Sequence, residues 1–144
     1  MTRYVLDTNG WLKLLTGKVP DIIVDGVSVL GSDAILLIPA AVEAELFSIA
    51  RQRSWGSKKL NTLTELIDKS IIIHTNEEIV QRYAEIDAFS QGKDSARPLG
   101  MSARNMGKND LWIAATASVA AAVLITGDQD FDHLDGVFVS VKRL

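Results

Sequence analysis

Acidic side chains recur beside apolar segments that lie far apart in this sequence. The candidates for chemistry are five carboxylates: Asp7, Glu45, Asp110, Asp128 and Asp130. Asp7 directly follows the apolar run Tyr4–Leu6, and Asp128 follows Val123–Thr126 after one glycine. Carboxylates held close together repel one another, and a hard divalent cation relieves that repulsion. Oxygen ligands alone suit Mg²⁺ or Mn²⁺ rather than zinc.

Such a site predicts hydrolysis of a phosphodiester bond. A pair of bound metal ions lowers the pKa of water and clamps the attacking and leaving oxygens of an in-line displacement. The sequence contains no cysteine, and its two histidines, His74 and His133, are expected to be structural or on the surface. We therefore expect a metal-activated water to be the nucleophile.

Alternating strands and helices are expected to position these acids. The apolar runs predict strands at Tyr4–Leu6, Ile35–Ile38, Ile71–Ile73, Val123–Thr126 and Val137–Val141. Helical periodicity predicts helices over residues 10–17, Ala40–Arg53, Lys58–Lys69 and Glu77–Ser90, and one that opens at Asn109 and Asp110. This alternation is typical of an α/β fold with a mostly parallel sheet and helices on both faces.

Two segments are less regular. Val19–Asp33 is ambiguous, because Pro20 and Asp21 could open a short helix that the following glycines interrupt. Gln91–Gly107 contains three glycines and a proline and is expected to be a long loop, which in a compact domain is often functional.

The acids converge if the first and fourth strands are neighbours. Asp7 and Asp128 then lie at the carboxyl edge of the sheet, where ligands bind in open α/β folds. Glu45 lies one to two turns into a helix that starts at this edge, and Asp110 lies in the first turn of another. Each acid also has an ordinary explanation: Asp7 could cap a helix, Asp110 could favour a helix dipole, and Asp128 could belong to a turn.

Composition restricts the possible partners. The chain has 144 residues, and 15 Lys+Arg against 18 Asp+Glu give a net charge of −3. Nucleic acid would therefore have to bind a local basic patch. The candidate basic residues are Arg51 and Arg53 with Lys58 and Lys59, and Arg97, Arg104 and Lys108 near Asp110. There is no apolar run of signal-peptide or membrane-span length, so we expect a cytoplasmic protein.

Four segments resemble the acidic motifs of PIN-domain nucleases, and most of all those of VapC-type toxins from toxin–antitoxin modules. They are LDTN from Leu6, AAVEAELFSIA from Ala40, NDLWIAATA from Asn109 and LITGDQDF from Leu124. The motifs occur in the family's order. The resemblance covers residues 4–131 and implies a single PIN domain over residues 1–144.

The resemblance implies a three-layer fold with a parallel five-stranded sheet in the order 3-2-1-4-5. It also implies Mg²⁺- or Mn²⁺-dependent endoribonuclease activity, homodimerisation and inhibition by a small cognate antitoxin. Position by position, Asp7, Glu45, Asp110 and Asp128 match the four acids, Asp130 an auxiliary acid, and Thr8, Asn9 and Thr126 the supporting polar residues. Glu43 competes with Glu45, but about 200° of helical rotation separates them, so only one can face the site. The resemblance favours Glu45.

Other functions are compatible with parts of this pattern. The chain could be a PIN-domain RNA-processing nuclease that is not a toxin, or a non-catalytic protein-interaction module of the same fold. A phosphoacceptor receiver domain also gathers aspartates at a parallel-sheet edge. That class needs a lysine just past a late strand, and Lys142 lies too close to the C-terminus.

Overall fold

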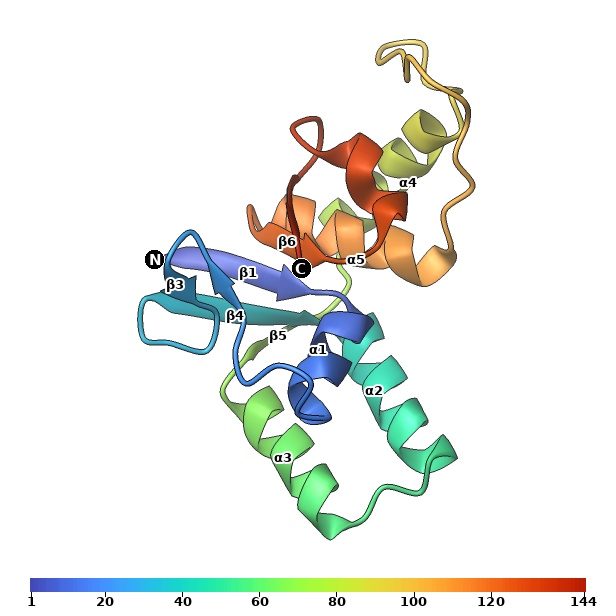
Figure 1. The fold of residues 1–144 in the computed structure, drawn as a ribbon. Coiled ribbons are helices and arrows are strands. Elements are labelled where there is room, and N and C mark those ends of the chain that lie inside the picture. Colours follow the sequence, from blue (N-terminus) through green and yellow to red (C-terminus); the bar gives the residue numbers. More distant parts are fainter.

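A parallel sheet forms the centre of the computed structural model, which describes residues 1–144 (Figure 1). Its strands are β1 (Thr2–Leu6), β4 (Ala34–Pro39), β5 (Ile71–Ile73), β6 (Val123–Thr126) and β7 (Ser140–Arg143). The strand order is β5-β4-β1-β6-β7, and every pairing is parallel. Numbered along the chain this is the order 3-2-1-4-5, so the predicted fold is confirmed.

The register brings the ends of β1 and β6 together. Leu6 pairs with Ile125, so the residues that follow each strand emerge side by side. Val5, Leu6, Leu124 and Ile125 are all fully buried. Strands that are covered on both faces appear in a sequence as continuous apolar runs, which explains why β1 and β6 could be predicted.

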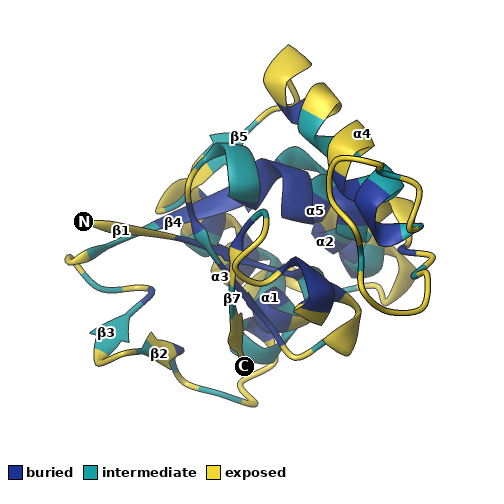
Figure 2. Cartoon of the chain, turned by 90° about the horizontal axis from the view of Figure 1, so that it is seen from above, coloured by how far each residue is buried: buried dark blue, intermediate teal, exposed yellow.

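Helices surround the sheet in two groups (Figure 1). They are α1 (Thr8–Leu15), α2 (Ala40–Gln52), α3 (Ser57–Asp68), α4 (Glu77–Ser90) and α5 (Lys108–Val119). Helix α5 contacts β1, β4 and β6, and its small residues Ala114, Ala115 and Ala117 are fully buried against neighbouring elements. Buried residues gather on the central strands and on α5 (Figure 2). No helix combines the length and apolar character needed to cross a membrane.

The last strand exists, but its bounds were predicted too early in the chain. The apolar run Val137–Val141 predicted a strand there, but β7 begins only at Ser140. A 3₁₀ helix, η1 (Gln129–Leu134), precedes it, and the carbonyl of Leu134 accepts from the backbone N–H groups of Val137 and Phe138. Phe138 packs against the core at the end of this turn and does not belong to the sheet, so its apolar side chain did not indicate a strand.

The ambiguous segment Val19–Asp33 forms a small antiparallel hairpin rather than a helix. Its strands are β2 (Ile23–Val24) and β3 (Val27–Ser28). Asp25 and Gly26 connect them with φ values of 50° and 82°. An Asp-Gly pair with both residues at positive φ is the preferred two-residue hairpin turn, so the signal was present in the sequence.

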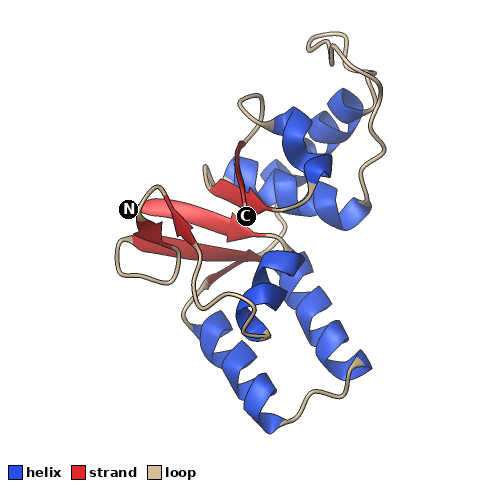
Figure 3. Cartoon of the chain, viewed as in Figure 1, coloured by secondary structure: helices blue, strands red, loops and turns tan.

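The segment Gln91–Gly107 contains no helix or strand, as expected of a loop. In Figure 3 it extends beyond α4, away from the sheet, before the chain returns to the start of α5. The return is anchored where the Arg104 N–H donates to the Ser90 carbonyl at 2.7 Å.

Candidate active site

Asp7 lies at the junction of β1 and α1 and is 5% exposed. Its Oδ1 accepts from the Gly10 N–H at 2.8 Å, which caps α1, and its Oδ2 accepts from Thr126 Oγ1 at 2.5 Å. The capping explanation is therefore correct, and it fixes the carboxylate at the sheet edge. Burial raises the pKa of Asp7, while the Thr126 and Gly10 hydrogen bonds and the Lys13 ammonium oppose this rise.

Thr126 connects Asp7 to the acidic turn after β6. Its hydroxyl, fully buried, also accepts from the Asp128 N–H at 2.9 Å. Asp128 Oδ1 in turn accepts from the Asp130 N–H at 2.9 Å and caps η1. The turn explanation of Asp128 is also correct, and these bonds set the positions of both acids.

Asp110, Asp128 and Asp130 form the tightest group of acids. Each offers one carboxylate oxygen, and these three atoms lie within 4.8 Å of one another. Burial, followed by the charges of the neighbouring acids, raises the pKa of Asp110 to about 6. The acids that act on Asp110 are Asp128, Asp130, Asp7 and Glu45. The structure thus gathers all five predicted acids at one edge of the sheet, and an oxygen-only donor set of this kind fits Mg²⁺ or Mn²⁺.

Glu45, not Glu43, is the α2 acid that faces this group. Glu45 Oε2 accepts from Thr8 Oγ1, and Oε1 accepts from Asn109 Nδ2 at 2.7 Å. These bonds join the first turns of α1 and α5 to α2. The Glu43 side chain makes no hydrogen bond or ion pair and is absent from the charges that act on Asp110. Sequence reasoning treated Asn109 only as a helix-start residue and missed its contact with Glu45.

The buried histidine supports the turn that carries Asp130. His133, in η1, shares a 2.7 Å hydrogen bond with Ser90 Oγ at the end of α4, and Ser90 also donates to Met106 Sδ at 3.4 Å. Burial lowers the pKa of His133, so the ring is neutral at pH 7. The expectation of a structural histidine agrees with this position.

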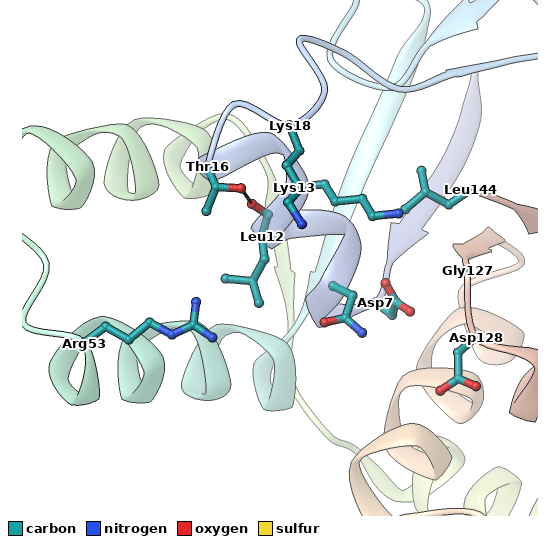
Figure 4. A pocket seen from close by; sticks show the side chains of 10 residues that line it. Asp7, Leu12, Lys13, Thr16, Lys18, Arg53, Gly127, Asp128 and Leu144 are labelled. Atoms are coloured by element: carbon teal, nitrogen blue, oxygen red, sulfur yellow. Dashed lines mark hydrogen bonds between the residues drawn. The ribbon is translucent and has the colours of Figure 1, made fainter.

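An open cleft of about 600 Å³ runs from the acids across α1 (Figure 4). Its lining is Asp7, Asn9, Leu12, Lys13, Thr16, Lys18, Arg53, Gly127, Asp128 and Leu144. Of the basic residues expected to bind RNA, only Arg53 lines it. Arg51 lines a separate hollow with Phe47 and Trp55, Lys108 lies exposed beside Asp110, and the charge of Arg104 acts on His133.

Two cations of this cleft, Lys13 and Lys18, were missed by sequence reasoning. They belong to α1 and the turn after it, and neither is part of a basic run. The available signal was that Lys13 lies on the helix that Asp7 opens and Lys18 follows shortly after it, and α1 begins at the same edge of the sheet as the acids.

Comparison with known proteins assigns the family. The chain matches the PIN-domain model over residues 4–137 and therefore belongs to the PIN-domain family. It is 31% identical over 123 residues to Ribonuclease VapC1 of Haemophilus influenzae, across 85% of this chain and 84% of that protein. The resemblance to VapC-type proteins deduced from the four motifs is confirmed.

Solved structures share the fold. VapBC2 from Rickettsia felis, bound to a DNA fragment from its promoter, matches with a TM-score of 0.78 and 20% identity, over 99% of this chain and 98% of that one. VapBC-5 from Mycobacterium tuberculosis, a member of the VapBC family of toxin–antitoxin systems, matches with a TM-score of 0.59 and 25% identity, over 100% and 98%.

Proposed function

We propose that this chain is a VapC-type endoribonuclease that hydrolyses RNA phosphodiester bonds with the help of a divalent cation, Mg²⁺ or Mn²⁺. The observation that carries the proposal is the convergence of carboxylate oxygens from Asp110, Asp128 and Asp130 within 4.8 Å. Three anionic groups this close are costly without a counter-ion. The 31% identity to a protein named as a ribonuclease supports RNA as the substrate.

Each acid has a distinct place in this proposal. Asp110, Asp128 and Asp130 would hold the cation, and Asp7 would complete the site from the end of β1. A divalent cation, when bound, supplies Lewis-acid chemistry for phosphodiester hydrolysis. Glu45 is held by Thr8 and Asn109 and would orient groups at the margin of the site. Asp110 must lose its proton to bind a cation, and a pKa of about 6 places that step just below neutral pH.

A small antitoxin is the partner that this proposal implies. Two solved structures with the same fold are VapBC2 and VapBC-5, and the second is a member of the VapBC family of toxin–antitoxin systems. We propose that the chain acts as the toxin of such a pair and that it forms a homodimer.

Cleavage of RNA by the purified, partner-free chain tests the proposal. Structured RNAs are incubated with Mg²⁺, Mn²⁺ or EDTA, and wild type is compared with Asp7→Asn and Asp110→Asn. We expect cleavage only with a divalent cation and a loss of at least about 100-fold in both variants. Asp68→Asn, which removes an exposed acid at the end of α3, is the matched control and should cleave like wild type. Cleavage in EDTA, or full activity in both site variants, would falsify the proposal.

A further inference from the structure

The cleft that reaches the acids has a second, positively charged wall. Lys13 and Lys18 approach it from α1 and the turn that follows, and Arg53 approaches it from the end of α2. In Figure 4 Arg53 and Asp128 stand on opposite sides of the opening, with Asp7 between them. Three cations thus share one concave surface with Asp7 and Asp128, in a chain whose net charge is −3.

None of these cations forms an ion pair within the protein, although the charge of Lys13 acts on Asp7. The four ion pairs of the structure are Arg82–Glu85, Arg97–Glu85, Lys142–Asp25 and Arg143–Asp132. Lys18 and Arg53 are exposed and Lys13 is half-buried. Without an ion pair, all three can meet an anion that enters the cleft.

The residues of this wall are suited to bind the sugar–phosphate backbone of a nucleic acid. Lysine binds phosphate as a point charge, and arginine binds it with a planar pair of donors. The lining contains no aromatic ring on which a base could stack, and its only apolar residues are Leu12 and Leu144. Contacts of this kind position a nucleic acid without reading its sequence.

Not every cation at the end of α2 faces this cleft. Arg51 lies two positions before Arg53 at the same helix end, but it lines the hollow that contains Phe47 and Trp55. The two arginines therefore carry the same charge on different surfaces.

We propose that Lys13, Lys18 and Arg53 form a phosphate-binding wall that holds the backbone of a single-stranded RNA segment beside the scissile phosphate. The RNA reaches the acids across α1 and the end of α2. This inference rests on the proposed endoribonuclease function and assigns its substrate-binding surface.

The test compares two triple variants that lose the same charge. Lys13→Ala/Lys18→Ala/Arg53→Ala removes the wall, and Arg51→Ala/Lys58→Ala/Lys69→Ala removes three exposed cations outside the cleft. Both are made in an Asp110→Asn background, so that RNA is bound without being cut. Binding of a labelled short single-stranded RNA is measured by fluorescence anisotropy at several salt concentrations.

We expect the wall variant to bind at least about 10-fold more weakly at low salt. Its slope of log affinity against log salt should fall by about 2, because each phosphate contact to a single strand contributes about 0.7. The control triple should stay within about threefold of its parent. Equal losses in the two triples, or an unchanged slope in the wall variant, would overturn the inference.

Single variants and cleavage kinetics separate this inference from the proposed function. Arg53→Ala should lower the slope by about 0.7 and Arg51→Ala should not, which keeps the comparison available if a triple variant folds poorly. In the active protein, the wall triple should raise KM with little change in kcat. A wild type that cleaves RNA while both triples bind alike refutes only the wall. A wild type that never cleaves RNA refutes the function.

Discussion

Thr126→Val tests how the site is held together. Thr126 is fully buried between the ends of β1 and β6, and its hydroxyl donates to Asp7 and accepts from the Asp128 N–H. Valine has nearly the same shape but lacks the hydroxyl, so the substitution leaves a buried carboxylate oxygen and a backbone N–H without their partners.

The expected cost follows from these two bonds. A hydrogen bond to a charged group contributes about 1.5–3 kcal/mol and one between neutral groups about 1 kcal/mol. The variant should therefore lose about 2.5–4 kcal/mol of unfolding free energy at neutral pH. For a domain of this size each kcal/mol lowers Tm by about 3 °C, so Tm should fall by about 8–12 °C.

The pH dependence separates this role from simple packing. The Thr126 bond favours ionised Asp7 and lowers the pKa of that carboxyl, so its loss raises the pKa further. The stability difference from wild type should be largest above both pKa values and shrink as pH falls through them. The acid limb of the kcat/KM profile should move to higher pH, because ionised Asp7 is the form proposed to act.

Two matched variants control the assay. Thr126→Ser keeps the hydroxyl and should retain the wild-type pH profile. Thr116→Val also removes a buried threonine hydroxyl, but that hydroxyl donates only to the Trp112 carbonyl in α5. It should leave the pH profile unchanged. If Thr126→Val melts like Thr116→Val and keeps the wild-type profile, the reasoning about Asp7 is wrong.

Three further predictions concern the acids and their supports. With EDTA present, the unfolding free energy of wild type should fall as pH rises from about 4 through 6, because the folded-state pKa of Asp110 is raised from 3.8 to about 6. The unfolding free energy of Asp110→Asn, measured by urea denaturation, should depend less steeply on pH. Glu45→Gln should lower kcat/KM for RNA cleavage at least about 10-fold and Glu43→Gln less than about threefold; equal effects would reject the assignment of Glu45. Ser90→Ala, which removes the bond to His133, should cost about 1–2 kcal/mol in chemical denaturation; a wild-type midpoint would show that the bond is not stabilising.

The sequence contained most of the fold because buried parallel strands and amphipathic helices leave direct patterns. Val123–Thr126 and Glu77–Ser90 were predicted with the bounds that the structure shows. Val137–Val141 was misplaced because apolar residues that pack under a turn look like a short strand. Periodicity alone could not choose the site-facing acid of α2, because both glutamates lie on the same helix and only tertiary contacts distinguish them.

The positive wall of the cleft could not be predicted from the sequence for a similar reason. Its cations come from separate segments, and only the packing of α1 beside α2 brings Lys13, Lys18 and Arg53 to one surface. Arg51 and Arg53 were grouped as one basic cluster, and the end of α2 directs them to different hollows. Closeness in sequence therefore did not indicate which cations share a site.

Calorimetric titration of Mn²⁺ into the partner-free chain at pH 7 tests most directly whether the acids form a cation site. We predict binding by wild type and by Asp68→Asn with equal affinity, and binding at least about 10-fold weaker in Asp110→Asn. Absence of binding to wild type, or the same affinity in Asp110→Asn, would contradict the assignment of these carboxylates to a divalent cation.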